Sequence, residues 1–362
     1  MYEIKINSKL IIAVIIFLSI LYGAHLFILS THQKIYEEDL TNFQYILPVI
    51  IISFFAISIY FTMKFSEFLY SYIYLIFGLY LGYIFYLFQI SICVKIFLYF
   101  FTLPETLNIG ILYIAPLIIC IYGIINALRT KIEKITLKYP GYQNKIQILH
   151  LSDIHLGAIH QKGSIIKIVN EIQDLHPDIV VITGDLADGS LRVKHDWLMP
   201  FNNLSMPILY VTGNHEEMNP KEDMITVVNM SNIKYIGMHE TFKFKGVNFI
   251  GEDFGYDLRQ CLLDVKQEQG VPNVLLYHVP NLLPDELNKY NIFLFLAGHT
   301  HGGQLFPLGI FAYLSNACFS GLYPNETNDR YIYVSEGVNN AVVPMRVGSS
   351  RIFPLITIEG YN

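Results

Sequence analysis

A short apolar stretch in the middle of the chain ends in two residues that could bind a metal. Residues 148–157 read Ile-Leu-His-Leu-Ser-Asp-Ile-His-Leu-Gly, so Asp153 and His155 follow the apolar run directly. In an extended chain, residues two apart point to the same side. The carboxylate and the imidazole would therefore project together from one strand end, as half of a metal site.

Four later segments repeat this pattern. Each is a short hydrophobic run followed at once by Asp, Asn or His. They are Val180–Thr183 before Gly184-Asp185, Ile208–Thr212 before Gly213-Asn214-His215-Glu216, Val274–Tyr277 before His278, and Ile292–Ala297 before Gly298-His299-Thr300-His301. Strands of one parallel sheet end at one edge, where α/β proteins bind their ligands. We therefore expect all five endings to form one cluster.

The side chains in this cluster define the chemistry. The candidate ligands are Asp153, His155, Asp185, Asn214, His278, His299 and His301. Oxygen and imidazole donors suit Mn²⁺, Fe²⁺, Zn²⁺ or Mg²⁺, and a set without thiolates is not a structural zinc site. Seven ligands are too many for one ion but suit two divalent ions that share a carboxylate. Any one of these histidines alone would be better explained by a hydrogen-bonding role. Because all five strand ends carry such residues, we favour the metal interpretation.

A pair of divalent ions points to phosphoester hydrolysis. Two such ions can hold the attacking and leaving oxygens of a phosphoester and lower the pKa of water, so no side-chain nucleophile is needed. The second half of the chain contains no nucleophile-elbow motif and no P-loop, which agrees with this reaction class.

The composition indicates a membrane module that precedes this domain. The chain has 362 residues, 53% of them hydrophobic and 15% charged, and its mean hydropathy is +0.40. About 20 apolar residues in a helix span a bilayer. Four segments of residues 1–128 qualify, namely Leu10–Leu29, Tyr45–Met63, Phe68–Ile90 and Ile109–Leu128. The shorter run Ile92–Phe101 could extend the third helix or lie at the interface.

Basic residues predict the orientation of these helices. Lys5 and Lys9 precede the first helix, Lys64 follows the second, and residues 129–138 are rich in Lys and Arg, whereas the connection 30–44 is mainly acidic. By the positive-inside rule, both termini lie in the cytoplasm. We expect an integral protein of the inner, cytoplasmic membrane with its catalytic domain in the cytoplasm. A cleaved signal peptide is less consistent, because further spanning runs follow the first.

The remaining chain predicts a layered α/β domain. Residues 129–144 form an expected basic juxtamembrane linker that ends in a Tyr-Pro-Gly turn, and residues 145–362 form the domain. Expected helices at 165–175, 194–204, 221–230 and 258–268 alternate with strands, a hairpin at 242–250, and closing strands at 331–334 and 352–358. No G-x-G-x-x-G motif is present, so we predict a four-layer α/β/β/α sandwich and not a dinucleotide-binding domain.

Cysteine usage and charge exclude other classes. The four cysteines show no C-x-x-C and no close pair, which argues against a disulfide scaffold or a zinc knuckle. The formal net charge of −6 and the lack of a basic block that could neutralise phosphates argue against a nucleic-acid partner.

The order of the five motifs resembles the calcineurin-like metallophosphoesterases, over residues 145–362. The run Gly298–Gln304 is similar to the bacterial branch that carries N-terminal membrane helices. The resemblance implies that Asp153, His155 and His301 bind the first metal, that Asp185 bridges, and that Asn214, His278 and His299 bind the second.

The resemblance also implies roles around the metals. His215 would steady the phosphoryl oxygens or protonate the leaving group, and Arg346 would contact a substrate phosphate. Glu336 departs from the basic residue that this branch more often has, which leaves substrate contacts at this end open.

The expected function is a membrane-anchored phosphodiesterase or pyrophosphatase, with Mn²⁺ as the preferred metal. Its position at a membrane suggests a lipid-linked substrate, such as the UDP-2,3-diacylglucosamine cleaved by similar bacterial enzymes. The apolar run Leu305–Leu314, directly after the last motif, could contact the bilayer or an acyl chain. The alternative is a membrane scaffold or sensor that keeps the fold without turnover. A transporter is less consistent, because the apolar helices contain no charged pairs.

Overall fold

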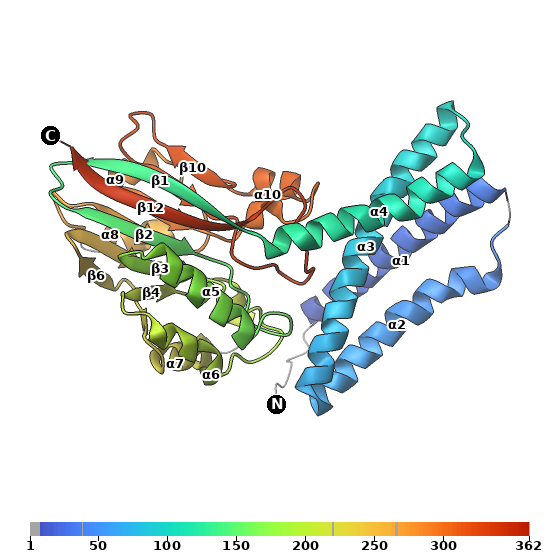
Figure 1. Ribbon diagram of the computed structural model, residues 1–362, viewed down its shortest axis with the longest axis horizontal. Helices are drawn as coiled ribbons and strands as arrows, with labels where there is room; N and C mark the ends of the chain where they lie inside the picture. Colours follow the sequence, from blue (N-terminus) through green and yellow to red (C-terminus); the bar gives the residue numbers. More distant parts are fainter. Residues whose placement is uncertain (1–7, 38, 219–220, 265–266, 362) are drawn as a thin grey trace. The chain divides into compact units, whose positions relative to one another are not determined.

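The computed structural model describes residues 8–37, 39–218, 221–264 and 267–361 (Figure 1). Contacts divide the chain into two compact units, Met1–Ile125 with Val342–Met345, and Asn126–Ala341 with Arg346–Asn362. Each unit has its own hydrophobic core.

The first unit consists of long apolar helices. They are α1 (Ser8–Tyr36), α2 (Asn42–Phe65), α3 (Glu67–Phe100) and α4 (Glu105–Leu128), and all four are long and apolar enough to cross a membrane. Thr41 and Gln44 form a reciprocal capping box at the start of α2. Because α3 continues to Phe100, the run Ile92–Phe101 extends the third helix. Lys5, used above for the orientation, lies outside the described residues.

Large apolar side chains cover the outside of these helices. Phe54, Phe68 and Ile118 are 62%, 83% and 62% exposed, respectively. Soluble monomers rarely expose an apolar surface of this size to water. The four helices therefore indicate insertion into a membrane.

The second unit contains two six-stranded sheets. The first has the order β1-β12-β2-β3-β4-β5, and the second has the order β10-β11-β9-β8-β7-β6. The strands of the first sheet are β1 (Thr130–Pro140), β2 (Lys145–Leu151), β3 (Ile179–Thr183), β4 (Ile208–Val211), β5 (Ile233–Tyr235) and β12 (Arg351–Tyr361). Those of the second sheet are β6 (Thr241–Phe244), β7 (Val247–Gly251), β8 (Asn273–Leu276), β9 (Leu294–Ala297), β10 (Gly321–Pro324) and β11 (Tyr331–Val334).

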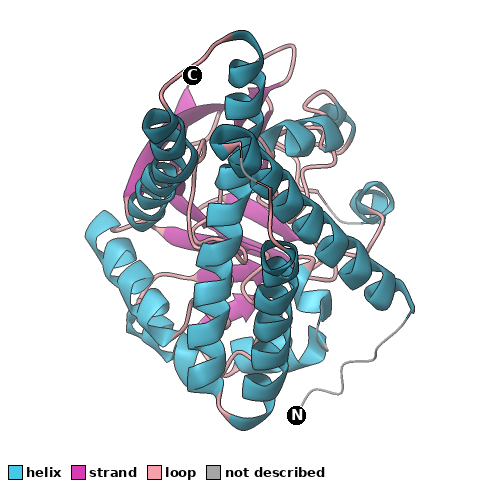
Figure 2. Cartoon of the chain, turned by 90° about the vertical axis from the view of Figure 1, so that its right-hand side faces the viewer, coloured by secondary structure: helices cyan, strands magenta, loops and turns pink. Residues whose placement is uncertain are grey.

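Alternation along the strands places the two sheets face to face. In β2, Ile148 packs into the core shared with Leu276 and Leu296 of the second sheet, whereas Leu149 joins a different core on the outer face. That outer core includes α5 (Lys162–Leu175), which buries Ile165, Ile168, Val169 and Ile172 at helical spacing. Helices therefore cover the outer face of the first sheet (Figures 1 and 2).

Helices also cover the second sheet. α8 (Leu258–Asp264) and α9 (Glu286–Lys289) share a core with strand residues such as Leu275 and Phe295. The other short helices are α6 (His195–Leu198), α7 (Lys221–Asn229) and α10 (Gly309–Ser315), and the 3₁₀ turns are η1 (Met199–Asn203), η2 (His215–Met218) and η3 (His301–Gly303). The predicted α/β/β/α architecture is thus confirmed. Of the helix expected at 258–268, residues 265–266 lie outside the described part.

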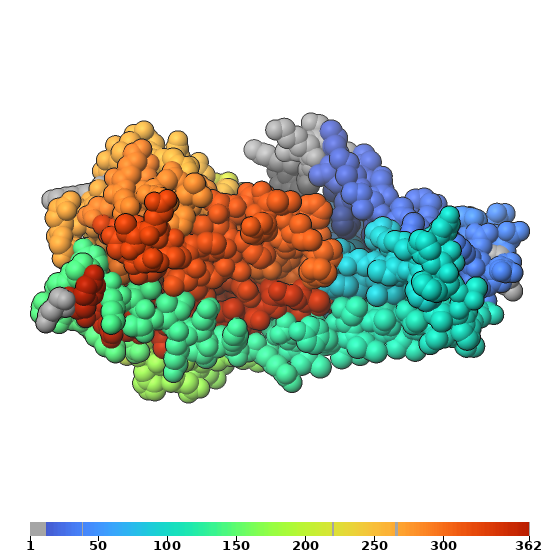
Figure 3. All heavy atoms as spheres, turned by 90° about the horizontal axis from the view of Figure 1, so that it is seen from above, coloured from blue at the N-terminus to red at the C-terminus, as the bar shows by residue number. Residues whose placement is uncertain are grey.

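Two details of the sequence prediction are wrong. Most of the expected linker 129–144 is strand β1, which pairs in parallel with β12 from Thr130 opposite Arg351 to Pro140 opposite Tyr361 (Figure 1). In the space-filling view the green and red segments lie side by side (Figure 3). Ile135, Leu137 and Tyr139 alternate with polar residues, but the dense positive charge obscured this signal. The five metal-bearing strands also do not share one sheet, because β8 and β9 belong to the second sheet.

Strand β1 allows a test of its place in the core. Leu137 is 3% exposed and packs between the sheets, whereas Ile132 on the same strand is 37% exposed. We expect Leu137→Ala to lower the free energy of unfolding by about 2–5 kcal/mol, because a buried cavity remains. The matched variant Ile132→Ala should change it by under about 1 kcal/mol.

The single tryptophan of the chain makes this measurement specific. Trp197 lies in the core of the second unit, so its fluorescence during urea titration of the full chain reports unfolding of that unit. Equal urea midpoints for the two variants would contradict the packing of β1 described here.

Candidate metal centre

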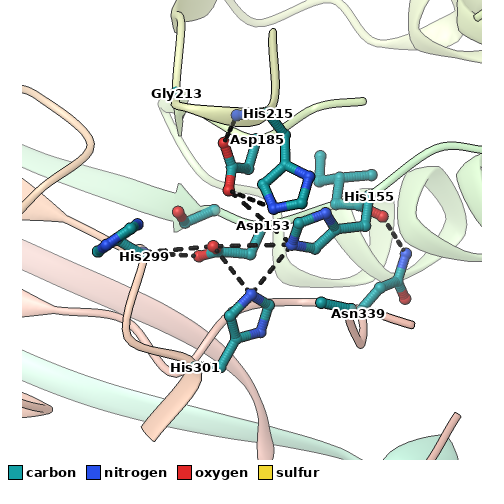
Figure 4. Close-up of polar contacts among 12 residues, drawn as sticks. Asp153, His155, Asp185, Gly213, His215, His299, His301 and Asn339 are labelled. Carbon is teal, nitrogen blue, oxygen red and sulfur yellow. Dashed lines mark hydrogen bonds and ion pairs between the residues drawn. The ribbon is translucent and has the colours of Figure 1, made fainter. Parts of the chain in front are cut away.

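The seven predicted ligands come together at one edge shared by the two sheets. Figure 4 shows Asp153, His155, Asp185, His299 and His301 of this set. Asp153 and His155 follow β2, Asp185 follows β3, and Asn214 follows β4 in the first sheet. His278 follows β8 in the second sheet, and His299 and His301 follow β9. The ligands thus arrive from opposite sheets, and both sheets are needed to build the site.

One group of ligand atoms lies around His301. Its Nε2 is 3.3 Å from Oδ1 of Asp153 and 3.0 Å from Nε2 of His155. Nε2 of His155 is in turn 4.0 Å from Oδ2 of Asp185. Asp153, His155 and His301 therefore present three donor atoms to one point, with Asp185 next to them.

A second group lies on the other side of Asp185. Nε2 of His278 is 3.1 Å from Oδ2 of Asp185 and 3.1 Å from Oδ1 of Asn214. Nδ1 of His299 is 2.8 Å from the same Asn214 oxygen. Since Asp185 is close to both groups, its carboxylate is in the position required of a bridging ligand.

The backbone bends sharply where it carries these ligands. Five of them have positive φ angles that L-residues rarely adopt, namely Asp153, His155, Asp185, His299 and His301. Such conformations cost of order 1–3 kcal/mol each and persist only where the surrounding structure enforces them. At Gly184, a Cβ atom would lie only 2.6 Å from Nδ1 of His278, so glycine permits the close approach of the two sheets.

Burial prepares these groups to bind cations. Asp153, His155 and His278 are fully buried, and Asp185 is 1% exposed. Burial holds the pKa of both His155 and His301 well below the usual value, so both imidazoles are neutral and keep a lone pair. Neutral nitrogens 3.0 Å apart beside buried carboxylates fit a divalent cation by the chemistry of the donor set.

Asp185 and His278 influence each other strongly. Burial acts to raise the pKa of Asp185, but His278 and His155 lower it overall, so this carboxylate stays ionised. Burial likewise acts to lower the pKa of His278, but Asp185 raises it to about 10. A cation that binds His278 must therefore displace its proton, which makes metal affinity fall at low pH.

His215 is placed differently from the ligands. Its Nδ1 lies 3.0 Å from the carbonyl oxygen of Asp188, which can only accept, so Nδ1 carries the hydrogen. Its Nε2 lies 3.9 Å from Oδ2 of Asp185, and its side chain is 20% exposed, more than those of His155 or His301. His215 thus turns Nε2 toward Asp185 from the more exposed side of the centre.

Comparison with known proteins agrees with this geometry. Residues 146–303 match the family model of the calcineurin-like phosphoesterases. This segment, which contains all seven predicted ligands, is similar to the calcineurin-like metallophosphoesterases. The predicted family resemblance is confirmed at this level.

The relatives come from animals and bacteria. The chain is 33% identical over 241 residues to a Caenorhabditis elegans protein named as a metallophosphoesterase, covering 61% of this chain and 50% of the relative. It is 31% identical over 229 residues to an uncharacterised Helicobacter pylori metallophosphoesterase, with coverages of 60% and 61%. It is 31% identical over 260 residues to a Bos taurus transmembrane protein with a metallophosphoesterase domain, with coverages of 64% and 58%.

The matches cover only part of each relative. The chain spans about half to three fifths of the length of these relatives. Since they include animal as well as bacterial proteins, membership of the bacterial branch stays a prediction.

The sequence did not reveal the role of Glu216 in the candidate metal centre. It is 2% exposed, and its carboxylate accepts hydrogen bonds from the backbone N–H groups of Gly213, Asp185 and Ala187 at 2.6, 3.0 and 2.9 Å. Burial, and then the nearby Asp185 charge, raises its pKa to about 7. It ties the loops after β3 and β4 together; its position directly after Asn214-His215 was the only signal.

Asn339 supports the other side of the metallophosphoesterase centre. Its Nδ2 donates to the carbonyl of Ile154 at 2.7 Å, and its backbone N–H donates to the carbonyl of Asp153 at 3.0 Å. It thereby holds the turn that carries Asp153 and His155. No sequence signal pointed to it, because it lies 185 positions after Ile154.

Arg346 is fully buried and already bonded. Its guanidinium makes five hydrogen bonds, to the carbonyls of His301, Gly337 and Asn339 and to the side chains of Asn340 and Ser349. Burial lowers its pKa to about 10, so the group remains charged near neutrality. This arrangement favours a role in holding the His301 backbone over the direct phosphate contact expected from the sequence.

The hydrogen bonds of Glu216 lead to a prediction about metal affinity. We expect Glu216→Ala to weaken Mn²⁺ binding by about 10–100-fold, because Asp185 loses the support of its loop. Glu217→Ala, at the exposed neighbouring position, should bind Mn²⁺ as the unchanged protein does. Competition with a fluorescent chelator measures both affinities, and equal values for the two variants would rule out this role of Glu216.

Proposed function

We propose that this protein is a membrane-anchored phosphoesterase with two metal ions that hydrolyses a phosphodiester or pyrophosphate bond. The observation that carries the proposal is the pair of buried ligand groups on either side of Asp185. One group takes Asp153, His155 and His301, the other takes Asn214, His278 and His299, and Asp185 serves both. The complete ligand set argues against the alternative of a scaffold or sensor without turnover.

The metal ions and the protein side chains would have different roles in this reaction. Two divalent ions would supply positive charge to the phosphoryl oxygens and lower the pKa of the attacking water. His215 keeps its hydrogen on Nδ1 through the Asp188 carbonyl, so its Nε2 can accept a hydrogen bond from a water or, when protonated, donate to a phosphoryl or leaving oxygen. Burial of the ligands on their protein side leaves this open side for the substrate.

The donor set also guides the choice of metal. Three oxygen-bearing and four imidazole side chains without a thiolate suit Mn²⁺, and Fe²⁺, Zn²⁺ or Mg²⁺ are the alternatives. Mn²⁺ is our proposal because the sites combine carboxylate and amide oxygens with neutral imidazoles.

An apolar cavity next to the centre supports a lipid-linked substrate. The cavity has a volume of about 270 Å³ and begins at Gly302, the residue after His301. Phe306, Ile310 and Tyr313 are among its apolar lining residues. The surrounding surface is also apolar, since Phe311 and Leu314 of α10 are 68% and 74% exposed. We propose that the 305–314 segment holds an acyl chain while the phosphate lies at the metals.

A diacylated nucleoside diphosphate sugar, such as UDP-2,3-diacylglucosamine, combines these requirements. It carries a pyrophosphate for the metals and acyl chains for the cavity. We further propose that the catalytic unit faces the cytoplasm, on the basis of Lys64 and the basic residues 129–138.

Catalysis and metal binding can be separated by two variants. In the full chain purified in detergent with Mn²⁺, we expect Asp185→Asn to lose most bound metal and the hydrolysis of bis-p-nitrophenyl phosphate. His215→Gln should keep its metal but lower kcat by about 10²–10⁴-fold, because it loses a proton-transfer group.

The matched control for the charge change is Asp174→Asn, on the exposed surface of α5. It should retain both metal and activity. Full activity of Asp185→Asn would disprove the metal assignment, and metal binding without hydrolysis in the unchanged protein under several metals would favour the scaffold.

The cavity predicts a difference between lipid and small substrates. Ile310→Glu places a charge in the apolar lining at a position that is 53% exposed, so the fold should tolerate it. We expect kcat/KM for UDP-2,3-diacylglucosamine in mixed micelles to fall by about tenfold or more, which corresponds to about 1.4 kcal/mol. Hydrolysis of bis-p-nitrophenyl phosphate should not change.

The control is Leu263→Glu, which introduces the same charge at a 60% exposed position on α8. It should leave both activities unchanged. An equal loss of both activities in Ile310→Glu would speak against an acyl site.

A further inference from the structure

A second group of side chains that could hold a metal ion lies outside the candidate metal centre. His239, Glu252 and Cys261 bring one ligand atom each within 4.8 Å of one another. His239 lies in the turn between β5 and β6, Glu252 follows β7 directly, and Cys261 lies in α8. Three separate elements therefore meet at this group, and neither the sequence motifs nor the proposed reaction uses it.

Glu252 is the residue that indicates a ligand. It is 1% exposed, and one carboxylate oxygen, Oε1, pairs with Nδ1 of His239. The other oxygen, Oε2, is buried and receives no hydrogen bond of ordinary geometry from the described residues, and the Cys261 thiol is the neighbouring donor to this carboxylate. A buried carboxylate oxygen without a partner is costly unless a cation or a donor satisfies it.

The neighbouring charges do not serve this oxygen. The adjacent Asp253 pairs with Lys221 and accepts hydrogen bonds from Thr212 and Tyr235. The ion-pair partner of Glu252 in the described part of the chain is His239, through Oε1. Lys221 is therefore engaged by Asp253 and does not pair with Glu252.

Cys261 adds a sulfur donor to the group. It is 6% exposed and not in a disulfide. Burial, and then the Glu252 carboxylate, raises the pKa of its thiol to about 11, so it is a poor nucleophile without a metal. A bound cation would stabilise the thiolate and offset the charge of Glu252 at the same time.

The dimensions suit a small tetrahedral ion. Bonds of about 2.0–2.3 Å to nitrogen, oxygen and sulfur place tetrahedral ligand atoms about 3.3–3.7 Å apart. The three atoms lie within 4.8 Å of one another, so small side-chain rotations bring them to this spacing. The side chain of His239 is 43% exposed, which provides a path for entry and space for a water as fourth ligand.

We propose that His239, Glu252 and Cys261 form a separate mononuclear site for Zn²⁺ or a similar borderline divalent ion. One sulfur, one nitrogen and one oxygen donor select Zn²⁺ over Mg²⁺ or Ca²⁺. The ion connects the turn between β5 and β6 to β7 and α8, on the outer side of the second sheet. This site differs from the catalytic centre, which contains no sulfur ligand.

The difference in donors provides a specific test. Co²⁺ replaces Zn²⁺ at such sites, and a thiolate ligand produces a sulfur-to-cobalt charge-transfer absorption that oxygen and nitrogen ligands do not produce. In the full chain titrated with Co²⁺ in detergent, we expect this absorption in the unchanged protein. It should be absent in Cys261→Ser and strongly reduced in His239→Asn, in which asparagine tolerates the positive φ angle of 66°.

The matched control is Cys318→Ser, which alters another buried cysteine of the same unit. It should keep the absorption, and so should Asp185→Asn, which removes the catalytic metals only. Metal analysis after loading with Zn²⁺ should find one ion fewer per chain in Cys261→Ser and His239→Asn than in the Cys318→Ser control.

Trp197 fluorescence confirms that each variant is folded. No charge-transfer absorption in the folded, unchanged protein would overturn the proposal. Absorption that persists in Cys261→Ser, or unchanged metal content in His239→Asn, would overturn it as well.

Discussion

The position of the Asp185 carboxylate between two sets of imidazoles depends on one constraint, that both sheets end at the same edge. Each ligand group takes members from both sheets. Asp153 and His155 meet His301, and Asn214 meets His278 and His299. The apolar core between the sheets, with Ile148 facing Leu276 and Leu296, holds the two sets of strand ends in register. Loss of that packing would separate the ligands even if each loop kept its shape.

Buried polar and charged side chains hold this arrangement in place through hydrogen bonds. Five of the candidate metal ligands occupy strained backbone positions. The Glu216 carboxylate accepts hydrogen bonds from the turns that carry them, and Asn339 and Arg346 donate to these turns. Full burial of Arg346 next to the acidic centre places a fixed positive charge behind the His301 loop. Residues outside the candidate ligand set therefore hold the centre in place, while His215 beside Asp185 stays 20% exposed.

The sequence was most informative where local pattern and chemistry coincide. The strand endings before Asp185, Asn214 and His299 could be recognised because a short apolar run stops at a glycine and a polar ligand. The four apolar helices could be recognised because their length matches a bilayer. Strand β1 was missed because its partner, β12, lies more than 200 positions later, and its lysines resemble a membrane linker. The roles of Asn339 and Arg346 were also missed, since their contacts with Ile154 and His301, far away in the sequence, reveal them.

The amino-acid sequence alone determined the donor types, their order and the local turns, because these follow from residue chemistry and from the period of neighbouring apolar residues. It thereby predicted a chain with apolar helices followed by a domain that carries the candidate ligands of two metal ions. The tertiary structure decided that the ligands come from two facing sheets, that Arg346 is buried, and that His239, Glu252 and Cys261 meet. These facts depend on distances between residues far apart in the chain, and packing of the whole core sets those distances.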